Sequence, residues 1–170
     1  TIFRLAGDPE KSGVTQSEPF GNQNLFLVHT ALSDFEEEKY IHHERVMREG
    51  WQARSSEKTL SLTVGGVKVN LLEEEDGHKV VTRYPDGAKL ELTFKPTKPL
   101  VSFGDRGLSR KGADPASVSW YWSYTRLQAK GTLFQNGEEI AVEGIAWMDH
   151  EIQDVSTVFV APGNAGTAHE

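Results

Sequence analysis

Short runs in which hydrophobic and polar residues alternate recur along most of this chain, and a period of two is typical of β-strands. The longest run, residues 117–151, is divided by Asn136-Gly137, a dipeptide that favours the two positive φ angles of a tight hairpin turn. Shorter strands are predicted at residues 2–5, 24–32, 39–47, 59–64, 66–72, 78–84 and 88–95. The pattern therefore predicts an antiparallel all-β fold, and periodicity alone leaves a barrel and a sandwich both open.

The segments between these strands are predicted as turns and loops. Gly65-Gly66, Asp76-Gly77 and Pro85-Asp86-Gly87 are typical turn sequences, and residues 8–21 and 101–114 are predicted to be loops. Residues 51–58 could form one short helical turn or a loop, and residues 36–49 have an ambiguous helical period. Helices are therefore expected to contribute little to the fold.

The two long strands mix aromatic rings with charges. On the first, Trp120, Trp122, Tyr124 and Arg126 share one face, and Tyr121, Ser123, Thr125 and Leu127 share the other. On the second, one face carries Ala141, Glu143, Ile145, Trp147, Asp149 and Glu151. Charges among aromatic rings are costly to bury unpaired. This pattern indicates either the wall of a ligand cavity or a core that contains a structural ion pair.

Composition limits the classes of function. The 170 residues fit one globular domain, and the net charge of −7 with a pI near 5.4 argues against a nucleic-acid partner. The chain has no cysteine, which excludes disulfides and thiolate metal sites. No apolar run approaches the roughly 20 residues of a membrane-spanning helix, and the first residues, TIFRLAGD, show no signal peptide.

Several strings resemble one protein family. GDRGLSRKG at 104–112, WYWSYTRL at 120–127 and AWMDHE at 146–151 resemble the bacterial lipocalin-like family labelled predicted secreted hydrolase, which is related to AttH-type proteins and to carotenoid 1,2-hydratase. The resemblance covers residues 1–151 and implies an incomplete lipocalin-like (calycin) barrel in the periplasm or outside the cell. Residues 152–170 are interpreted as an atypical C-terminal tail, because residues 154–170 resemble a short N-terminal piece of glycinamide ribonucleotide synthetase.

Asp149 and Glu151 are the first catalytic candidates. They share a strand face with Trp147 and stand about 7 Å apart along the strand. A carboxyl group beside an indole would have its pKa raised by desolvation, which suits a general acid for adding water to an alkene. The alternative is a structural anion paired with Arg126 or Arg106.

The aromatic residues and histidines provide the remaining candidates. Tyr121, Trp122, Tyr124 and Trp147 offer flat surface to an elongated apolar ligand, although aromatic residues on strands also form cores. His29 lies in the apolar run LFLVHTAL and is expected to point inward, where a carboxylate across the barrel would complete an acid–base pair. His42 and His43 should point to opposite faces.

Metal and cofactor sites are not predicted. His29, His150, Asp149 and Glu151 could be assembled into a ligand set, but no spacing signature requires it. The sequence also lacks a nucleophile elbow, a phosphate-binding glycine loop and a zinc-protease helix, and Ser109 and Ser123 have no recognisable His-Asp partners.

The glycine-rich loop at 103–112 completes the predicted site. Arg106 is expected to fold over the barrel end and pair with Asp149 or Glu151, whereas an exposed Arg106 would make the loop a simple connector. The sequence thus predicts a lipocalin-like domain that binds an apolar or isoprenoid-like small molecule, as a hydratase-like or hydrolase-like enzyme. The alternative is a non-catalytic lipid-binding or escort protein of the cell envelope.

Overall fold

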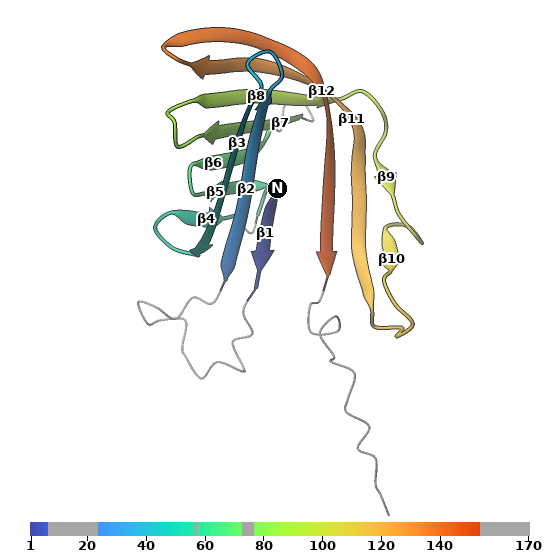
Figure 1. Ribbon diagram of the computed structural model, residues 1–170. Helices are drawn as coiled ribbons and strands as arrows, with labels where there is room; N and C mark the ends of the chain where they lie inside the picture. The colour runs from blue at the N-terminus through green and yellow to red at the C-terminus, as the bar shows by residue number, and fades with distance from the viewer. Residues whose placement is uncertain (7–23, 57, 73–76, 154–170) are drawn as a thin grey trace, which may run out of the picture. The chain divides into compact units, whose positions relative to one another are not determined.

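Every regular element that the structure describes is a β-strand (Figure 1). The computed structural model describes residues 1–6, 24–56, 58–72 and 77–153. Its twelve strands are β1 (Ile2–Leu5), β2 (Leu25–Asp34), β3 (Lys39–Arg48), β4 (Ala53–Ser55), β5 (Ser61–Val64), β6 (Val67–Leu72), β7 (Gly77–Arg83), β8 (Lys89–Pro96), β9 (Val101–Ser102), β10 (Leu108–Arg110), β11 (Val118–Gln135) and β12 (Glu138–Gln153). The predicted antiparallel all-β class is confirmed.

The chain divides into two compact units, which are described separately. The first unit comprises Thr1–Lys95 and Gln128–Gly144, and the second comprises Pro96–Leu127 and Ile145–Glu170. Strands β11 and β12 each contribute residues to both units. No helix within the described residues is long and apolar enough to cross a membrane.

The first sheet has the order β1-β2-β3, and its main feature is a long hairpin. Strands β2 and β3 pair along ten residues each, from Leu25 opposite Arg48 to Asp34 opposite Lys39. At the tip, the Asp34 carboxylate accepts the backbone N–H groups of Glu36 and Glu37, both at 3.1 Å. This side-chain cap satisfies two backbone donors that the turn would otherwise leave to solvent.

The second sheet runs in the order β10-β11-β8-β7-β6-β5-β4, with β9 and β12 also paired to β11. Two of its hairpins close with positive φ at both central residues, as the sequence predicts: 55° and 95° at Gly65 and Gly66, and 54° and 83° at Asn136 and Gly137. Within residues 51–58, predicted as a helical turn or a loop, the sequence prediction missed the short strand β4. It also missed β9 and β10 within the predicted loop 101–114.

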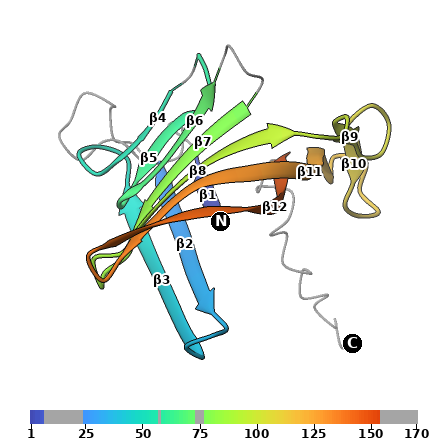
Figure 2. The same cartoon turned by 90° about the horizontal axis from the view of Figure 1, so that it is seen from above.

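The hydrophobic core of the first unit lies between the two sheets, where the β2–β3 hairpin crosses strands β4 to β6 (Figure 2). Phe26 and Val28 on β2 are buried against Ala53, Val64 and Val67. Burying a side chain as large as Phe26 stabilises the fold by about 1.5–3 kcal/mol. Because Phe26 and Val28 define the inward face of β2, the alternate residue His29 lies on the opposite face. The prediction that His29 points inward was therefore wrong.

The second unit is built around the first half of β11. Strands β9 and β10 both pair with it, Ser102 opposite Trp122 and Leu108 opposite Trp120. The Arg110 guanidinium donates hydrogen bonds to the carbonyls of Gly112 and Ala113, both at 3.1 Å. These two bonds lie within the loop, and the backbone N–H of Lys111 donates to the Ser117 carbonyl at 2.8 Å, next to the start of β11.

Candidate functional site

The second unit holds a carboxylate surrounded by hydrogen-bond donors. Asp149 on β12 accepts three hydrogen bonds at a single oxygen, Oδ1: one from the Tyr121 hydroxyl at 3.1 Å, one from the Trp147 indole N–H at 2.7 Å and one from the Ser123 hydroxyl. Ser123 is fully buried on β11. None of the described residues hydrogen-bonds to the second oxygen, Oδ2. The carboxylate is therefore fixed in orientation, with one oxygen left for another partner.

These donors determine the protonation state of Asp149. The hydrogen bond from Ser123, followed by that from Trp147, lowers the pKa of Asp149, and the smaller opposing effect of desolvation does not reverse the shift. Three donors favour the charged form because a protonated carboxyl accepts hydrogen bonds less well. The predicted raised pKa was wrong, because the indole presents its N–H group to the carboxylate. Asp149 is an anion near neutral pH and is unsuited to be the predicted general acid.

Glu151, the second predicted carboxylate, belongs to a neighbouring ion pair. Its Oε1 lies 2.6 Å from the Lys111 Nζ and accepts a hydrogen bond at 2.7 Å from the buried Ser119 hydroxyl. Both contacts lower the pKa of Glu151, with the Lys111 hydrogen bond the largest cause. The same ammonium group lies 4.8 Å above the Tyr121 ring. Lys111 thus pairs with Glu151 and also contacts the ring of Tyr121, whose hydroxyl donates to Asp149.

The predicted pairing of Arg106 with Asp149 or Glu151 was wrong. Its side chain is 92% exposed and pairs at 3.3 Å with the carboxylate of its neighbour Asp105. The backbone of Arg106 has a positive φ of 51°. Lys111, five positions later in the same loop, supplies the positive charge instead. Lys111 was not predicted as a partner of either carboxylate, and its ammonium group pairs with Glu151 on β12.

The predicted aromatic residues fall into two groups. Tyr121 stacks on Phe103, with ring centroids 4.3 Å apart, and shares the Asp149 cluster with Trp147. Trp122, on the other face of β11, stacks on His150 at 4.5 Å, where burial lowers the pKa of that histidine. The neighbouring candidates Tyr124 and Arg126 are half-buried and exposed, respectively.

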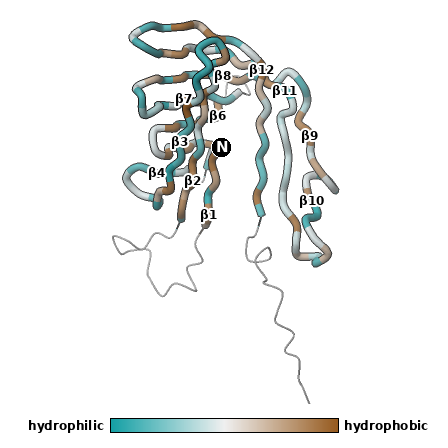
Figure 3. Tube along the Cα trace, in the orientation of Figure 1, coloured by the Kyte–Doolittle hydropathy of each residue, from teal (hydrophilic) through white to brown (hydrophobic). Residues whose placement is uncertain are grey.

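An exposed apolar strip lies next to the Asp149 cluster. Ile145 and Trp147 precede Asp149 on one face of β12, and they are 70% and 57% exposed. Figure 3 shows that β12 carries both hydrophobic and hydrophilic positions. These two side chains offer apolar surface beside the fixed carboxylate.

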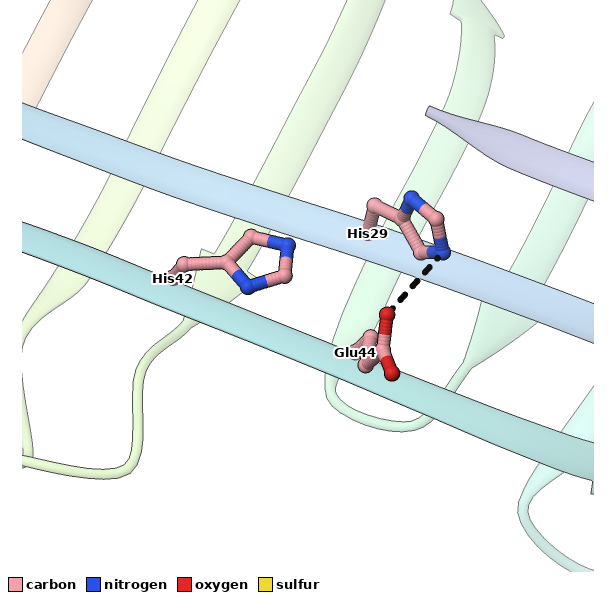
Figure 4. A group of neighbouring side chains, drawn as sticks. All are labelled: His29, His42 and Glu44. Atoms are coloured by element: carbon pink, nitrogen blue, oxygen red, sulfur yellow. Dashed lines mark ion pairs between the residues drawn. The ribbon is translucent and has the colours of Figure 1, made fainter.

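His29, the third predicted catalytic residue, belongs to the first unit. Its Nε2 lies 3.5 Å from Oε2 of Glu44, which stands directly opposite on β3. His42 joins this pair, and ligand atoms of the three residues all lie within 4.8 Å of one another (Figure 4). His29 was predicted to pair with a carboxylate across the barrel, and its carboxylate contact is instead with Glu44 on the adjacent strand. The ligand set considered from the sequence is not the one assembled, because Asp149 and Glu151 are held by hydroxyl, indole and ammonium groups.

A hollow of about 420 Å³ also lies in the first unit. Its lining is mostly polar and comprises Arg83, Gly87, Lys89, Glu91, Thr132, Phe134 and Glu139. Glu91 is already paired with Lys89 and, at 3.5 Å, with Lys79. This charged lining does not match the apolar ligand that the sequence predicts.

A protein-family model described as AttH-like matches residues 1–167. The chain belongs to the AttH-like family. This membership confirms the resemblance inferred from the sequence. A search of curated proteins gave no match. The division at residue 151 stays a prediction, and residues 154–170 lie outside the described residues.

Two solved structures resemble this AttH-like chain. An AttH protein from Nitrosomonas europaea is 28% identical in sequence, with a TM-score of 0.74. The match covers 88% of this chain and 43% of the Nitrosomonas chain. Kievitone hydratase from Nectria haematococca is 19% identical with a TM-score of 0.57, over 77% of this chain and 39% of its own. The chain therefore spans less than half the length of either structure. These similarities confirm the predicted lipocalin-like fold.

Proposed function

We propose that this AttH-like chain binds a small molecule with an apolar, isoprenoid-like body and a polar group, and that the Asp149 cluster recognises the polar group. The observation that supports this most is the orientation of Asp149. Its Oδ1 takes three donors, its Oδ2 takes none from the described residues, and Trp147 and Ile145 lie exposed beside it. A ligand hydroxyl could donate to Oδ2 while the hydrocarbon body covers the indole and the isoleucine.

The charge state of Asp149 narrows the chemistry that this site could perform. Protonation of an isolated alkene needs a group that carries a proton, and Asp149, whose pKa is lowered by its hydrogen-bond donors, is ionised near neutral pH. An anion can instead take a proton from water as the water attacks an ester carbonyl or a conjugated alkene. The protonated Asp149 then returns that proton to the leaving alkoxide or to the enolate carbon, so the carboxylate is regenerated. We therefore favour hydrolase-like or conjugate-hydratase chemistry over hydration of an isolated alkene.

The comparisons support this proposal at the level of class. The chain belongs to the AttH-like family, and one structure with the same fold is a hydratase by name. A periplasmic or secreted location is part of the proposal and rests on the family. The acidic net charge of −7 fits a small-molecule ligand better than a nucleic acid.

A second candidate function is supported by the ion pair at Glu151. Two anionic carboxylates tied to buried serines and to Lys111 form a fixed polar network that needs no catalytic role. In this alternative, the chain binds or escorts a lipid in the cell envelope without changing it. The two candidates share the binding surface and differ only in turnover.

Equilibrium binding of farnesol, an isoprenoid alcohol, and of farnesene, its hydrocarbon counterpart, tests the proposal through the fluorescence of the tryptophans. We expect saturable binding of both compounds, tighter for farnesol. Asp149→Asn should weaken farnesol binding about tenfold, because a hydrogen bond to a charged group contributes about 1.5 kcal/mol, and should leave farnesene binding unchanged. Trp147→Ala should weaken both.

The matched control is Glu143→Gln, which removes a carboxylate from the same face of β12, where Glu143 makes only a loose 3.6 Å contact with Lys130. This variant should bind both compounds normally. Equal weakening by Glu143→Gln and Asp149→Asn, or the absence of saturable binding, would overturn the proposal. Incubation with farnesyl acetate separates the candidates: release of farnesol that Asp149→Asn abolishes supports the enzyme, and binding without product supports the escort protein.

A further inference from the structure

Three metal-ligating side chains meet on the outer face of the β2–β3 hairpin. His29 on β2 stands opposite Glu44 on β3, and His42 precedes Glu44 by two residues on the same face of its strand. Figure 4 shows His29 and Glu44 directed toward each other, with the His42 ring beside them. One ligand atom from each residue lies within 4.8 Å of the other two.

We propose that His29, His42 and Glu44 bind a divalent transition-metal ion, for which Zn²⁺ is the best match. Two imidazole nitrogens and one carboxylate oxygen form a ligand set that Zn²⁺ and its neighbours in the first transition row accept, whereas Mg²⁺ and Ca²⁺ prefer oxygen alone. Three protein ligands leave at least one coordination position for water or another ligand. All three residues belong to the first unit, whereas Asp149 belongs to the second.

Coordination of Zn²⁺ by these three residues requires only that their side chains rotate. Ligand atoms on a tetrahedral Zn²⁺ stand about 3.3 Å apart, given metal–nitrogen distances of about 2.0–2.1 Å. The His29 Nε2 and Glu44 Oε2 atoms are already 3.5 Å apart. Because His42 and Glu44 are both exposed, rotation of their side chains can close the remaining gap without moving either strand.

The surroundings hold the ligands near this arrangement. The His29 ring packs edge-on against Phe3 at 6.2 Å and against His42 at 6.0 Å, and the His42 ring lies parallel to Tyr40 at 6.3 Å. The β2 backbone is fixed from the opposite face by the buried side chains of Phe26 and Val28. An exposed His–Glu pair alone would contribute little to stability. The contact between the two imidazole rings keeps His42 beside the pair, where it can provide the third ligand.

Titration of the untagged, chelator-treated chain with Zn²⁺ alone tests the proposal by calorimetry, and mass spectrometry of the dialysed protein gives the metal content. We expect one Zn²⁺ per chain with a dissociation constant of about 1 µM or tighter. His42→Ala and Glu44→Gln should each weaken binding at least about tenfold. Both residues are exposed, so the variants should keep the circular dichroism spectrum of the parent.

His43→Ala is the matched control, because His43 neighbours both ligands in sequence but lies on the opposite face, where it accepts a 2.6 Å hydrogen bond from Arg45. This variant should bind Zn²⁺ as the parent does. The visible absorption of bound Co²⁺ provides a second measurement, which His42→Ala should abolish. Absence of binding, or equal loss with His42→Ala and His43→Ala, would refute the site.

Discussion

Removal of the Ser123 hydroxyl is the most revealing perturbation of the Asp149 cluster. Ser123 is fully buried on β11 and donates to Asp149 Oδ1, and this hydrogen bond is the largest cause of the lowered pKa of that carboxyl. Ser123→Ala deletes one donor, creates almost no cavity and leaves the donors Tyr121 and Trp147 in place. Its effect should therefore measure the contribution of a single hydrogen bond.

The expected loss of unfolding free energy depends on how exposed Asp149, the partner of Ser123, is. A hydrogen bond to a charged group contributes about 1.5–3 kcal/mol, but Asp149 is exposed and water can replace part of the lost interaction. We expect Ser123→Ala to reduce the free energy of unfolding by about 1 kcal/mol and to raise the pKa of Asp149 toward its ordinary value. Ser119→Ala should instead raise the pKa of Glu151, to which Ser119 donates.

Urea denaturation and a carbon-13 NMR titration of the carboxyl groups provide the two measurements. A double-mutant cycle with Asp149→Ala isolates the pairwise contribution, since Ser123→Ala should cost little once the acceptor is gone. If Ser123→Ala shifts the pKa of Asp149 no more than Ser119→Ala does, the hydrogen-bond explanation for the lowered pKa is wrong.

Two further predictions concern the stability of the fold. The lowered folded-state pKa values of Asp149 and Glu151 contribute stability above the unfolded-state values of about 4, and this contribution is lost as the pH falls through the folded-state values. Urea midpoints should therefore fall below about pH 4 more steeply for the parent than for Asp149→Asn, and parallel curves would contradict this. A Cβ added at Gly131 would lie 1.8 Å from the Glu91 carbonyl oxygen. Gly131→Ala should thus destabilise the chain by about 3 kcal/mol, whereas Gly144→Ala, with open space around it, should not.

The sequence predicted the strands correctly where a turn sequence and an alternation of hydrophobic and polar residues occur together. The positive φ angles at Asn136 and Gly137 confirm that a two-residue signature can place a long hairpin. Strand β4 gave no such signal, because three residues are too few to show a period of two, and pairing with β5 defines the strand. Strands β9 and β10 were missed for the same reason, since both depend on pairing with β11.

The sequence predicted the main residues of the candidate site, but it did not predict which residues form hydrogen bonds and ion pairs with them. Alternation correctly placed Trp147, Asp149 and Glu151 on one face, but it does not show which residues of the neighbouring strand meet them. Ser119, Ser123 and Lys111 were therefore missed as partners, although both serines lay within the predicted strand. The cluster of His29 with Glu44 depends on the β2–β3 register, which the sequence does not reveal without a fixed turn length.

Photoaffinity labelling tests the central claim of ligand binding at the Asp149 cluster most directly. A farnesol analogue that carries a photoreactive diazirine is bound to the chain, activated by light and located by peptide mass spectrometry. We expect the label on residues 118–127 and 145–153, with competition by unlabelled farnesol and reduced labelling in Trp147→Ala. Labelling confined to the first unit, or spread evenly along the chain without competition, would contradict the claim.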